Sequence, residues 1–147
     1  MSNIELLEKT LPVAPLKIVA MESCRELGQK VNDYIVSFRE NTVSEASVSS
    51  LYVNYRSNNY LVDCCCPRFG TGEAKGVLRE TIRGTDLFIM TDVCNYSLTY
   101  SVSGHLNHMS PDDHFQDLKR IISAATGKAH RINVIMPFLY ESRQHKR

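Results

Sequence analysis

The chain has 147 residues, of which 43% are hydrophobic and 22% are charged, and its formal net charge is +1. This balance fits one globular domain with a substantial core, and the low charge excludes whole-molecule steering toward nucleic acid or an anionic membrane. No stretch approaches the roughly 18 apolar residues of a membrane span, and residues 1–16 lack the uninterrupted apolar core of a secretory signal. We therefore expect a cytoplasmic protein that binds neither nucleic acid nor membranes.

The first elements are predicted to be a strand and a helix. Leu16–Ala20 is a short apolar run, and Ser23 precedes Glu26 by three positions, the spacing of a capping box at a helix start. Apolar residues then recur at helical spacing, which predicts core packing for Cys24, Leu27, Val31, Tyr34, Ile35 and Phe38.

Two polar segments are predicted to be insertion loops. Residues 41–59 are rich in Ser, Asn and Thr, and residues 51–55 within them are compatible with a short strand of an edge hairpin. Residues 91–109 are longer than most connections, which indicates either function or disorder. No linker or repeat divides the chain, so we expect a single domain over residues 1–147.

A hairpin is predicted between the two polar segments. Residues 60–66 read as a strand ended by Pro67, and residues 74–82 read as the strand that returns. The glycines of residues 69–73 permit the positive backbone angles of a turn. We therefore expect a hairpin with a flexible tip.

The second half is predicted to contain a strand, a helix and a strand. Asp86–Met90 is strongly apolar, and residues 132–140 read as a buried strand. The helix between them has Ser110 as N-cap, Pro111 in its first turn and Gly127 as its stop. Its expected buried stripe is Phe115, Leu118, Ile121, Ile122 and Ala125.

This βαβ order predicts a parallel sheet in an α/β sandwich. Asp112 and Asp113 resemble a metal-binding or acid–base pair, but stabilisation of the helix dipole explains both without chemistry.

The five cysteines do not indicate a disulfide framework. Three are consecutive at positions 64–66, and adjacent strand residues point to opposite faces, so they do not readily bridge one another. Reduced thiols are the simplest interpretation, with Cys24 and Cys94 as small buried residues. A metal or redox role stays an alternative, although a metal site completed by His105 and His108 lacks CxxC spacing.

The carboxyl terminus is the clearest indication of a binding site. Arg143, Lys146 and Arg147 follow the apolar run of residues 132–140, and ligands of parallel α/β sheets lie beyond the carboxyl ends of strands. A planar Arg stacks on a nucleobase while a neighbouring cation neutralises phosphate oxygens. The pattern predicts a nucleotide polyphosphate site, with a solvated basic terminus as the alternative.

Three segments together resemble the amino-terminal half of ribose-phosphate pyrophosphokinase, the synthetase of phosphoribosyl pyrophosphate. They are Arg68-Phe69-Gly70-Thr71-Gly72-Glu73, then Ile82-Arg83-Gly84-Thr85-Asp86 leading into Leu87-Phe88-Ile89, and Val134-Ile135-Met136-Pro137-Phe138 followed by Arg143-Gln144-His145-Lys146-Arg147. Order and approximate spacing match over residues 68–147, while residues 16–38 agree in element order only. The resemblance implies a phosphoribosyltransferase-like, three-layer α/β sandwich with a mostly parallel sheet, incomplete at its carboxyl end.

The resemblance also implies an ATP site shared between the subunits of a homo-oligomer. Phe69 of one subunit would stack adenine against Arg143 of its neighbour, and Glu73 would accept a hydrogen bond from the exocyclic amine. An aromatic face, a guanidinium plane and a carboxylate acceptor suit adenine chemically. The alternative is that Phe69 packs locally at the tip and Glu73 is merely solvated.

Further nucleotide contacts are implied for Gln144 and Lys146, with Lys146 near the phosphates. Two positions depart from the family. Thr71 stands where Asn or Asp is usual, so this adenine contact is expected to be altered, and His145 replaces an acidic residue. These departures suggest a divergent branch, which has an alternative as a non-catalytic regulatory relative.

The family reaction moves the β,γ-diphosphoryl group of ATP, accompanied by Mg²⁺, to the anomeric hydroxyl of ribose 5-phosphate. The ribose 5-phosphate loop belongs to a second domain that family members have beyond the segment matched here. We therefore expect the ATP-binding portion of a ribose-phosphate diphosphokinase that serves nucleotide biosynthesis and is inactive by itself. A generic nucleotide- or phosphate-binding α/β module is the remaining alternative.

Overall fold

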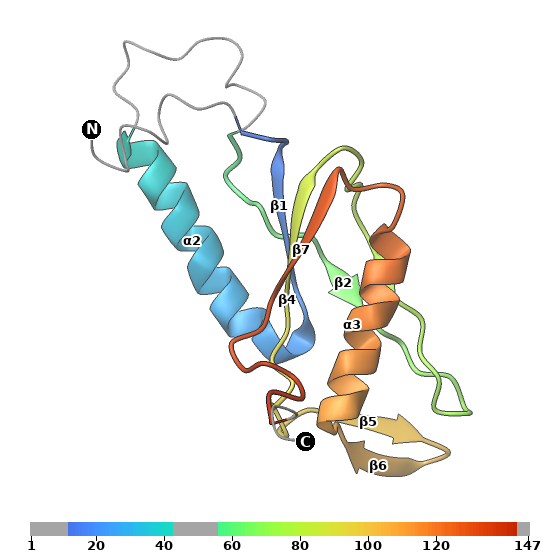
Figure 1. The fold of residues 1–147 in the computed structure, drawn as a ribbon. Coiled ribbons are helices and arrows are strands. Elements are labelled where there is room, and N and C mark those ends of the chain that lie inside the picture. The colour runs from blue at the N-terminus through green and yellow to red at the C-terminus, as the bar shows by residue number, and fades with distance from the viewer. Residues whose placement is uncertain (1–11, 43–55, 144–147) are drawn as a thin grey trace.

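The computed structural model describes residues 12–42 and 56–143 (Figure 1). In chain order the elements are β1 (Leu16–Ala20), the 3-10 helix η1 (Glu22–Cys24), α2 (Arg25–Thr42), β2 (Cys64–Cys65), β3 (Val77–Leu78), β4 (Asp86–Met90), β5 (Thr99–Val102), β6 (His105–His108), α3 (Pro111–Ala125) and β7 (Arg131–Ile135). Most of the insertion loop predicted at residues 41–59, including the strand at residues 51–55, lies outside the described residues.

A parallel sheet forms the centre of the domain. Its strand order is β1-β4-β7, with β4 paired in parallel to both neighbours. On the other edge of β1, Ile18 forms a parallel bridge to Leu61, and its carbonyl accepts from the Val62 N–H at 2.8 Å. The strand predicted at residues 60–66 is therefore divided between this bridge and the short β2.

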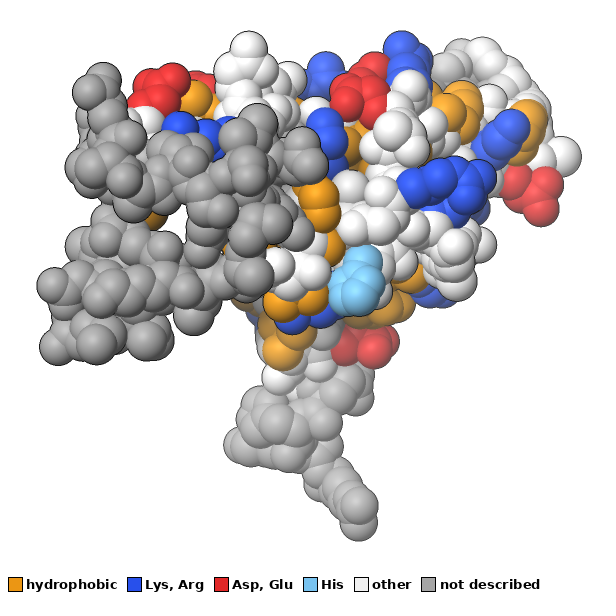
Figure 2. Space-filling view, turned by 90° about the horizontal axis from the view of Figure 1, so that it is seen from above, with side chains coloured by type: hydrophobic (Ala, Val, Ile, Leu, Met, Phe, Trp, Pro, Cys, Tyr) orange, Lys and Arg blue, Asp and Glu red, His pale blue; other side chains and the backbone are white. Residues whose placement is uncertain are grey.

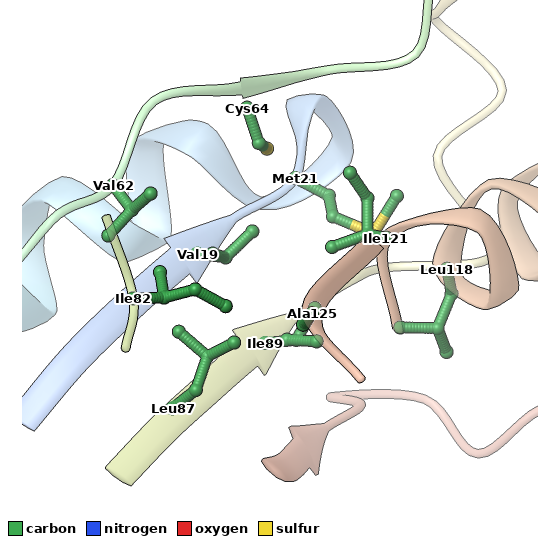
Figure 3. Close-up of a cluster of buried hydrophobic side chains, with 10 residues drawn as sticks. All are labelled: Val19, Met21, Val62, Cys64, Ile82, Leu87, Ile89, Leu118, Ile121 and Ala125. Carbon is green, nitrogen blue, oxygen red and sulfur yellow. The ribbon is translucent and has the colours of Figure 1, made fainter. Parts of the chain in front are cut away.

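The two long helices cover opposite faces of the sheet, which gives three layers (Figure 1). Successive strand residues point to opposite faces, so Ile18 belongs to the cluster that contains α2 residues, while Val19 belongs to the cluster that contains α3 residues. The side chains gathered on the α3 side are Val19, Met21, Val62, Cys64, Ile82, Leu87, Ile89, Leu118, Ile121 and Ala125 (Figure 3). The predicted three-layer α/β fold with a parallel sheet is confirmed.

Helix α3 begins and ends as predicted. The Ser110 Oγ accepts from the Asp113 N–H at 3.2 Å, and the Asp113 carboxylate accepts from the Ser110 N–H at 2.9 Å, which completes a capping box. Gly127, just beyond the helix, has a φ of 74°, a conformation that glycine adopts without a steric penalty. The predicted stripe packs toward the core, and the same face also buries His114 and Asp117.

The predicted capping box at the start of α2 was wrong. Ser23 lies inside η1, whose N-cap is Met21 and has no side-chain hydrogen bond. The Ser23 Oγ instead accepts from the Asp92 N–H at 3.0 Å. The Asp92 N–H, just beyond β4, thus binds the Ser23 hydroxyl that the local pattern assigns to the start of the helix. This hydrogen bond joins the carboxyl ends of β1 and β4.

Only a narrow face of α2 packs on the sheet. Val31 and Ile35 contact the core, and a Cβ added to Gly28 would lie 2.2 Å from the Cβ of Ala20, so the helix backbone closely approaches β1. Core packing was wrongly predicted for three residues of the neighbouring stripe, which are 36–72% exposed: Leu27, Tyr34 and Phe38.

Strand β7 is less buried than predicted. It lies at the edge of the three-stranded sheet, and the side chains of Val134 and Ile135 are each 42% exposed. The strand ends at Ile135, and Phe138 and Leu139 beyond it are also exposed. An apolar run does not distinguish an edge strand from a central one, which explains the error.

No helix within residues 12–42 and 56–143 is long and apolar enough to cross a membrane. Figure 2 views the molecule from the end at which the parallel strands begin. On the coloured part of this face, Lys and Arg side chains are dispersed among acidic, polar and apolar ones. The coloured part of this face therefore presents no continuous basic surface.

Candidate functional site

The predicted nucleotide-binding tip, residues 69–73, is a tight turn at the end of the hairpin that contains β2 and β3. The Phe69 N–H donates to the Glu73 carbonyl at 2.7 Å, and the Gly72 N–H donates to the Phe69 carbonyl at 2.9 Å. Gly72 has a φ of 91°, which favours glycine. The Phe69 side chain is 53% exposed, and Glu73 is also exposed. One ordered turn therefore presents an aromatic ring and a carboxylate to solvent.

Arg68, directly before the tip, is held by α3. Its NH1 and NH2 groups donate to the Oδ1 and Oδ2 atoms of Asp117, each at 2.9 Å, and Arg120 donates to Oδ1 at 2.6 Å. The Arg68 and Asp117 side chains are 10% and 7% exposed. A buried two-point ion pair fixes orientation as well as distance. It therefore attaches the base of the tip to the middle of α3.

A second hairpin, formed by β5 and β6, lies beside the first. It occupies residues 99–108 of the segment 91–109, where only a polar loop was expected, and Ser103 and Gly104 turn it with φ of 51° and 80°. Two positive φ values are typical of a two-residue hairpin turn. The Tyr100 ring lies under the Arg68 guanidinium, with 4.6 Å from Cζ to the ring centroid. The second hairpin therefore contacts the residue that supports the tip.

The other half of the predicted site follows β7. Tyr140 stacks on Phe115 of α3, with ring centroids 4.2 Å apart, and its hydroxyl donates to Asp112. These contacts hold the loop that leads to Arg143, which is exposed. Among the described hydrogen bonds, ion pairs and ring contacts, none joins Phe69 to Arg143 within one copy of the chain. Gln144 and Lys146 lie outside the described residues.

A cavity of about 190 Å³ lies between the carboxyl end of β1, the base of the first hairpin and α3. Cys64 and Cys66 line it together with Arg68, Tyr100 and His114. Burial raises the pKa of the Cys64 thiol to about 11 and that of the Cys66 thiol to about 12. Both thiols are therefore neutral near pH 7, the form in which a thiol is a poor nucleophile.

Within the described residues, the remaining cysteines and the acidic groups do not form a metal centre. Cys24 is buried as expected, whereas the expectation that Cys94 is buried was wrong, because Cys94 is exposed. Across residues 12–42 and 56–143, no group of three His, Cys, Asp or Glu side chains is placed to hold a metal ion.

Sequence reasoning missed the residues that hold the tip. Asp117 joins Arg68 across 49 positions of the chain, a pairing with no local pattern. Its burial was nevertheless detectable, because positions 114, 117, 118, 121 and 125 repeat at helical spacing. Tyr100 carried no equivalent signal.

The parallel sheet, the helices on its two faces and the hairpin beside α3 define a phosphoribosyltransferase-like α/β domain. Residues 16–147 match the family model described as the N-terminal domain of ribose phosphate pyrophosphokinase. The chain therefore belongs to this family. A search of curated proteins finds no relative that matches the chain.

Proposed function

We propose that this chain forms the ATP-binding portion of a ribose-phosphate diphosphokinase. In this enzyme type the anomeric hydroxyl oxygen of ribose 5-phosphate attacks the β-phosphorus of ATP. A new P–O bond forms, the bond between that phosphorus and the α,β-bridging oxygen breaks, and AMP leaves. The nucleotide contacts belong to Phe69, Glu73 and Arg143 in this proposal, with Gln144 and Lys146 in addition.

The observation that carries the proposal is the ordered, exposed tip in a chain of this family. Single exposed aromatic residues are normal on protein surfaces, so the exposure of Phe69 supports the proposal only together with the family to which the chain belongs. The ring supplies a stacking surface for a purine, and Glu73 supplies an acceptor for an exocyclic amine. Arg143 comes from a separate element, which supports a site completed by a second copy of the chain.

The described residues offer no set of ligands for a resident metal ion. We therefore assign Mg²⁺ to the ATP that enters the site and derive no catalytic step from it. Ribose 5-phosphate is likewise assigned no partner among these residues. In this proposal the matched domain binds the nucleotide, and a second domain of the enzyme type binds ribose 5-phosphate.

Calorimetric titration of the full chain with Mg·ATP tests the proposal. We expect binding, and we expect Phe69→Ala to weaken it about 5- to 160-fold, because loss of one base–aromatic stack costs about 1–3 kcal/mol. Tyr34→Ala is the matched control, since Tyr34 is 72% exposed on α2 and lies in no part of the proposed site. Equal affinities of the parent chain and Phe69→Ala would refute the proposal.

A regulatory relative without catalysis is a second candidate, favoured by one contact. The Thr71 hydroxyl donates to the Glu73 Oε2 at 3.2 Å, so it occupies part of the carboxylate assigned to adenine. Thr71→Val removes this donor while keeping the branched shape. If the variant binds ATP more tightly than the parent, Thr71 weakens the adenine contact and the regulatory candidate gains support; unchanged affinity counts against it.

A further inference from the structure

The first hairpin is held from two sides by elements far apart in the sequence. On one side, the Asp117 carboxylate of α3 meets the edge of the Arg68 guanidinium at two points. On the other side, the Tyr100 ring of β5 meets the same guanidinium at 4.6 Å. Arg68 is thus fixed both in its plane and across its face.

The turn of the second hairpin also reaches the tip itself. The Ser103 hydroxyl donates to the Gly70 carbonyl at 3.5 Å, a long contact. A Cβ built on Gly72 would lie 3.8 Å from a methyl carbon of Val102, which is ordinary packing distance. The residues between Phe69 and Glu73 therefore lie directly against the second hairpin.

We propose that Tyr100 is a positioning residue for nucleotide binding: the second hairpin holds the tip in the conformation that presents Phe69 and Glu73 to adenine. This inference rests on the proposed function. A tip fixed before binding loses less conformational freedom when the nucleotide arrives, so its affinity is higher than that of a loose tip. Tyr100 raises affinity through Arg68 without touching the nucleotide.

This role is separable from a contribution to the core. The two buried clusters contain no residue of β5 or β6, and β6 is exposed along its whole length. Loss of the Tyr100 ring therefore removes the contact on one face of the Arg68 guanidinium and leaves both hydrophobic clusters intact. A merely structural residue would instead lower the unfolding temperature without a selective effect on the tip.

Two measurements on the full chain test the inference. Hydrogen exchange reports the Phe69 and Gly72 amides, which are bonded within the tip, and calorimetry reports the affinity for Mg·ATP. We expect Tyr100→Leu to accelerate exchange at both amides and to weaken ATP binding about fivefold, as loss of a part-buried cation–π contact implies. Tyr100→Phe keeps the ring face and should behave as the parent chain does.

Tyr96→Leu is the matched control within the same insertion, because its ring is 58% exposed. If Tyr100→Leu leaves exchange and affinity unchanged while Phe69→Ala weakens binding, the inference is wrong and the proposed function stands. If Phe69→Ala has no effect on affinity, the proposed function fails. The exchange rates of the Phe69 and Gly72 amides in Tyr100→Leu then still decide whether Tyr100 fixes the tip. Exchange as slow as in the parent chain refutes this role, and faster exchange supports it.

Discussion

Gly76 and Arg120 lie in backbone contact, because a Cβ built on Gly76 would be 2.4 Å from the Arg120 carbonyl oxygen and 2.6 Å from its carbonyl carbon. The returning chain of the first hairpin therefore touches the middle of α3 without any side chain between them. Arg120 lies three residues, almost one helical turn, beyond Asp117, which pairs with Arg68, so the hairpin is attached to α3 at two places.

The first prediction concerns this contact. Gly76→Ala forces a methyl group against helix backbone that has no free rotamer with which to avoid it, and overpacking of this kind costs about 1–3 kcal/mol. We expect a lower urea midpoint and loss of exchange protection in the hairpin. Gly70→Ala is the control, since a Cβ at Gly70 meets nothing within 4 Å and should leave the midpoint unchanged. Equal midpoints for the two variants would contradict the prediction.

The second prediction concerns the start of α3. Ser110→Ala removes the acceptor for the Asp113 N–H and breaks the capping box, so the free energy of unfolding should fall by about 1 kcal/mol. Ser123→Ala is the matched control, because Ser123 is exposed in the same helix and alanine has the higher helix propensity. Chemical unfolding followed by circular dichroism distinguishes the two. A fall at Ser123 as large as that at Ser110 would show that hydroxyl loss alone, not capping, is responsible.

Local sequence patterns predicted the helix ends correctly where the hydrogen-bond partners are also close in the sequence. Ser110, Asp113 and Gly127 lie at both ends of α3, and their partners are within a few residues. The same signal failed at Ser23 because its oxygen binds the Asp92 N–H, 69 residues away. Capping patterns therefore predict a helix end only when no neighbouring strand end competes for the hydroxyl.

In the candidate site, too, features set by nearby residues were predicted and features set by distant residues were not. The glycines of the tip predicted a turn, and Gly72 has the expected positive φ. The ion pair of Arg68 and Asp117 was not predictable, because sequence patterns do not specify which buried acid meets which base. The Tyr100 contact was missed for a related reason: residues 91–109 were interpreted by composition, whereas the Ser103-Gly104 turn permits pairing of polar strands.

The third prediction concerns acid stability. Hydrogen bonding from Arg131 holds the pKa of the buried Asp86 carboxyl below its usual range, with further help from Asn133. A folded-state pKa that is depressed contributes stability above the unfolded value of about 3.9, and this stability is lost as pH falls through the folded value. We expect Asp86→Asn to flatten the fall of unfolding temperature below about pH 4.

Asp33→Asn, at an exposed position on α2, is the control for this titration. Thermal unfolding between pH 7 and pH 2 measures the acid slope of the parent chain and of both variants, and we expect the larger change in Asp86→Asn. If the unfolding temperature of Asp86→Asn falls with pH as steeply as that of the parent chain, Asp86 does not contribute to acid unfolding.

The fourth prediction concerns the thiols. Burial raises the pKa of Cys66 to about 12, so at pH 8 its thiolate, the form that reacts, is scarce. We expect iodoacetamide to label the exposed Cys94 first and Cys24, Cys64 and Cys66 only after denaturation. Peptide mass mapping over time measures each site. Labelling of Cys66 in the folded chain as fast as that of Cys94 would disprove the partly buried, neutral state of this thiol.

The fifth prediction concerns Tyr140, which connects the loop after β7 to the start of α3. The hydrogen bond to Asp112 raises the pKa of Tyr140 to about 12, with a smaller effect from the charge of Glu141. Because the folded pKa is raised, the contact stabilises the fold fully below the unfolded value of about 10 and is lost as pH rises toward 12. The loop that leads to Arg143 should therefore loosen in alkali.

Carbon-13 labelling of the tyrosine ring allows this pKa to be followed by NMR. Asp112→Asn should return the Tyr140 pKa most of the way toward about 10, because both the charge and the strong acceptor are lost. Glu141→Gln should lower it by much less, since Glu141 acts only through its charge. If the two variants shift the pKa equally, the hydrogen bond does not control it, and Asp112 does not hold the loop beside α3.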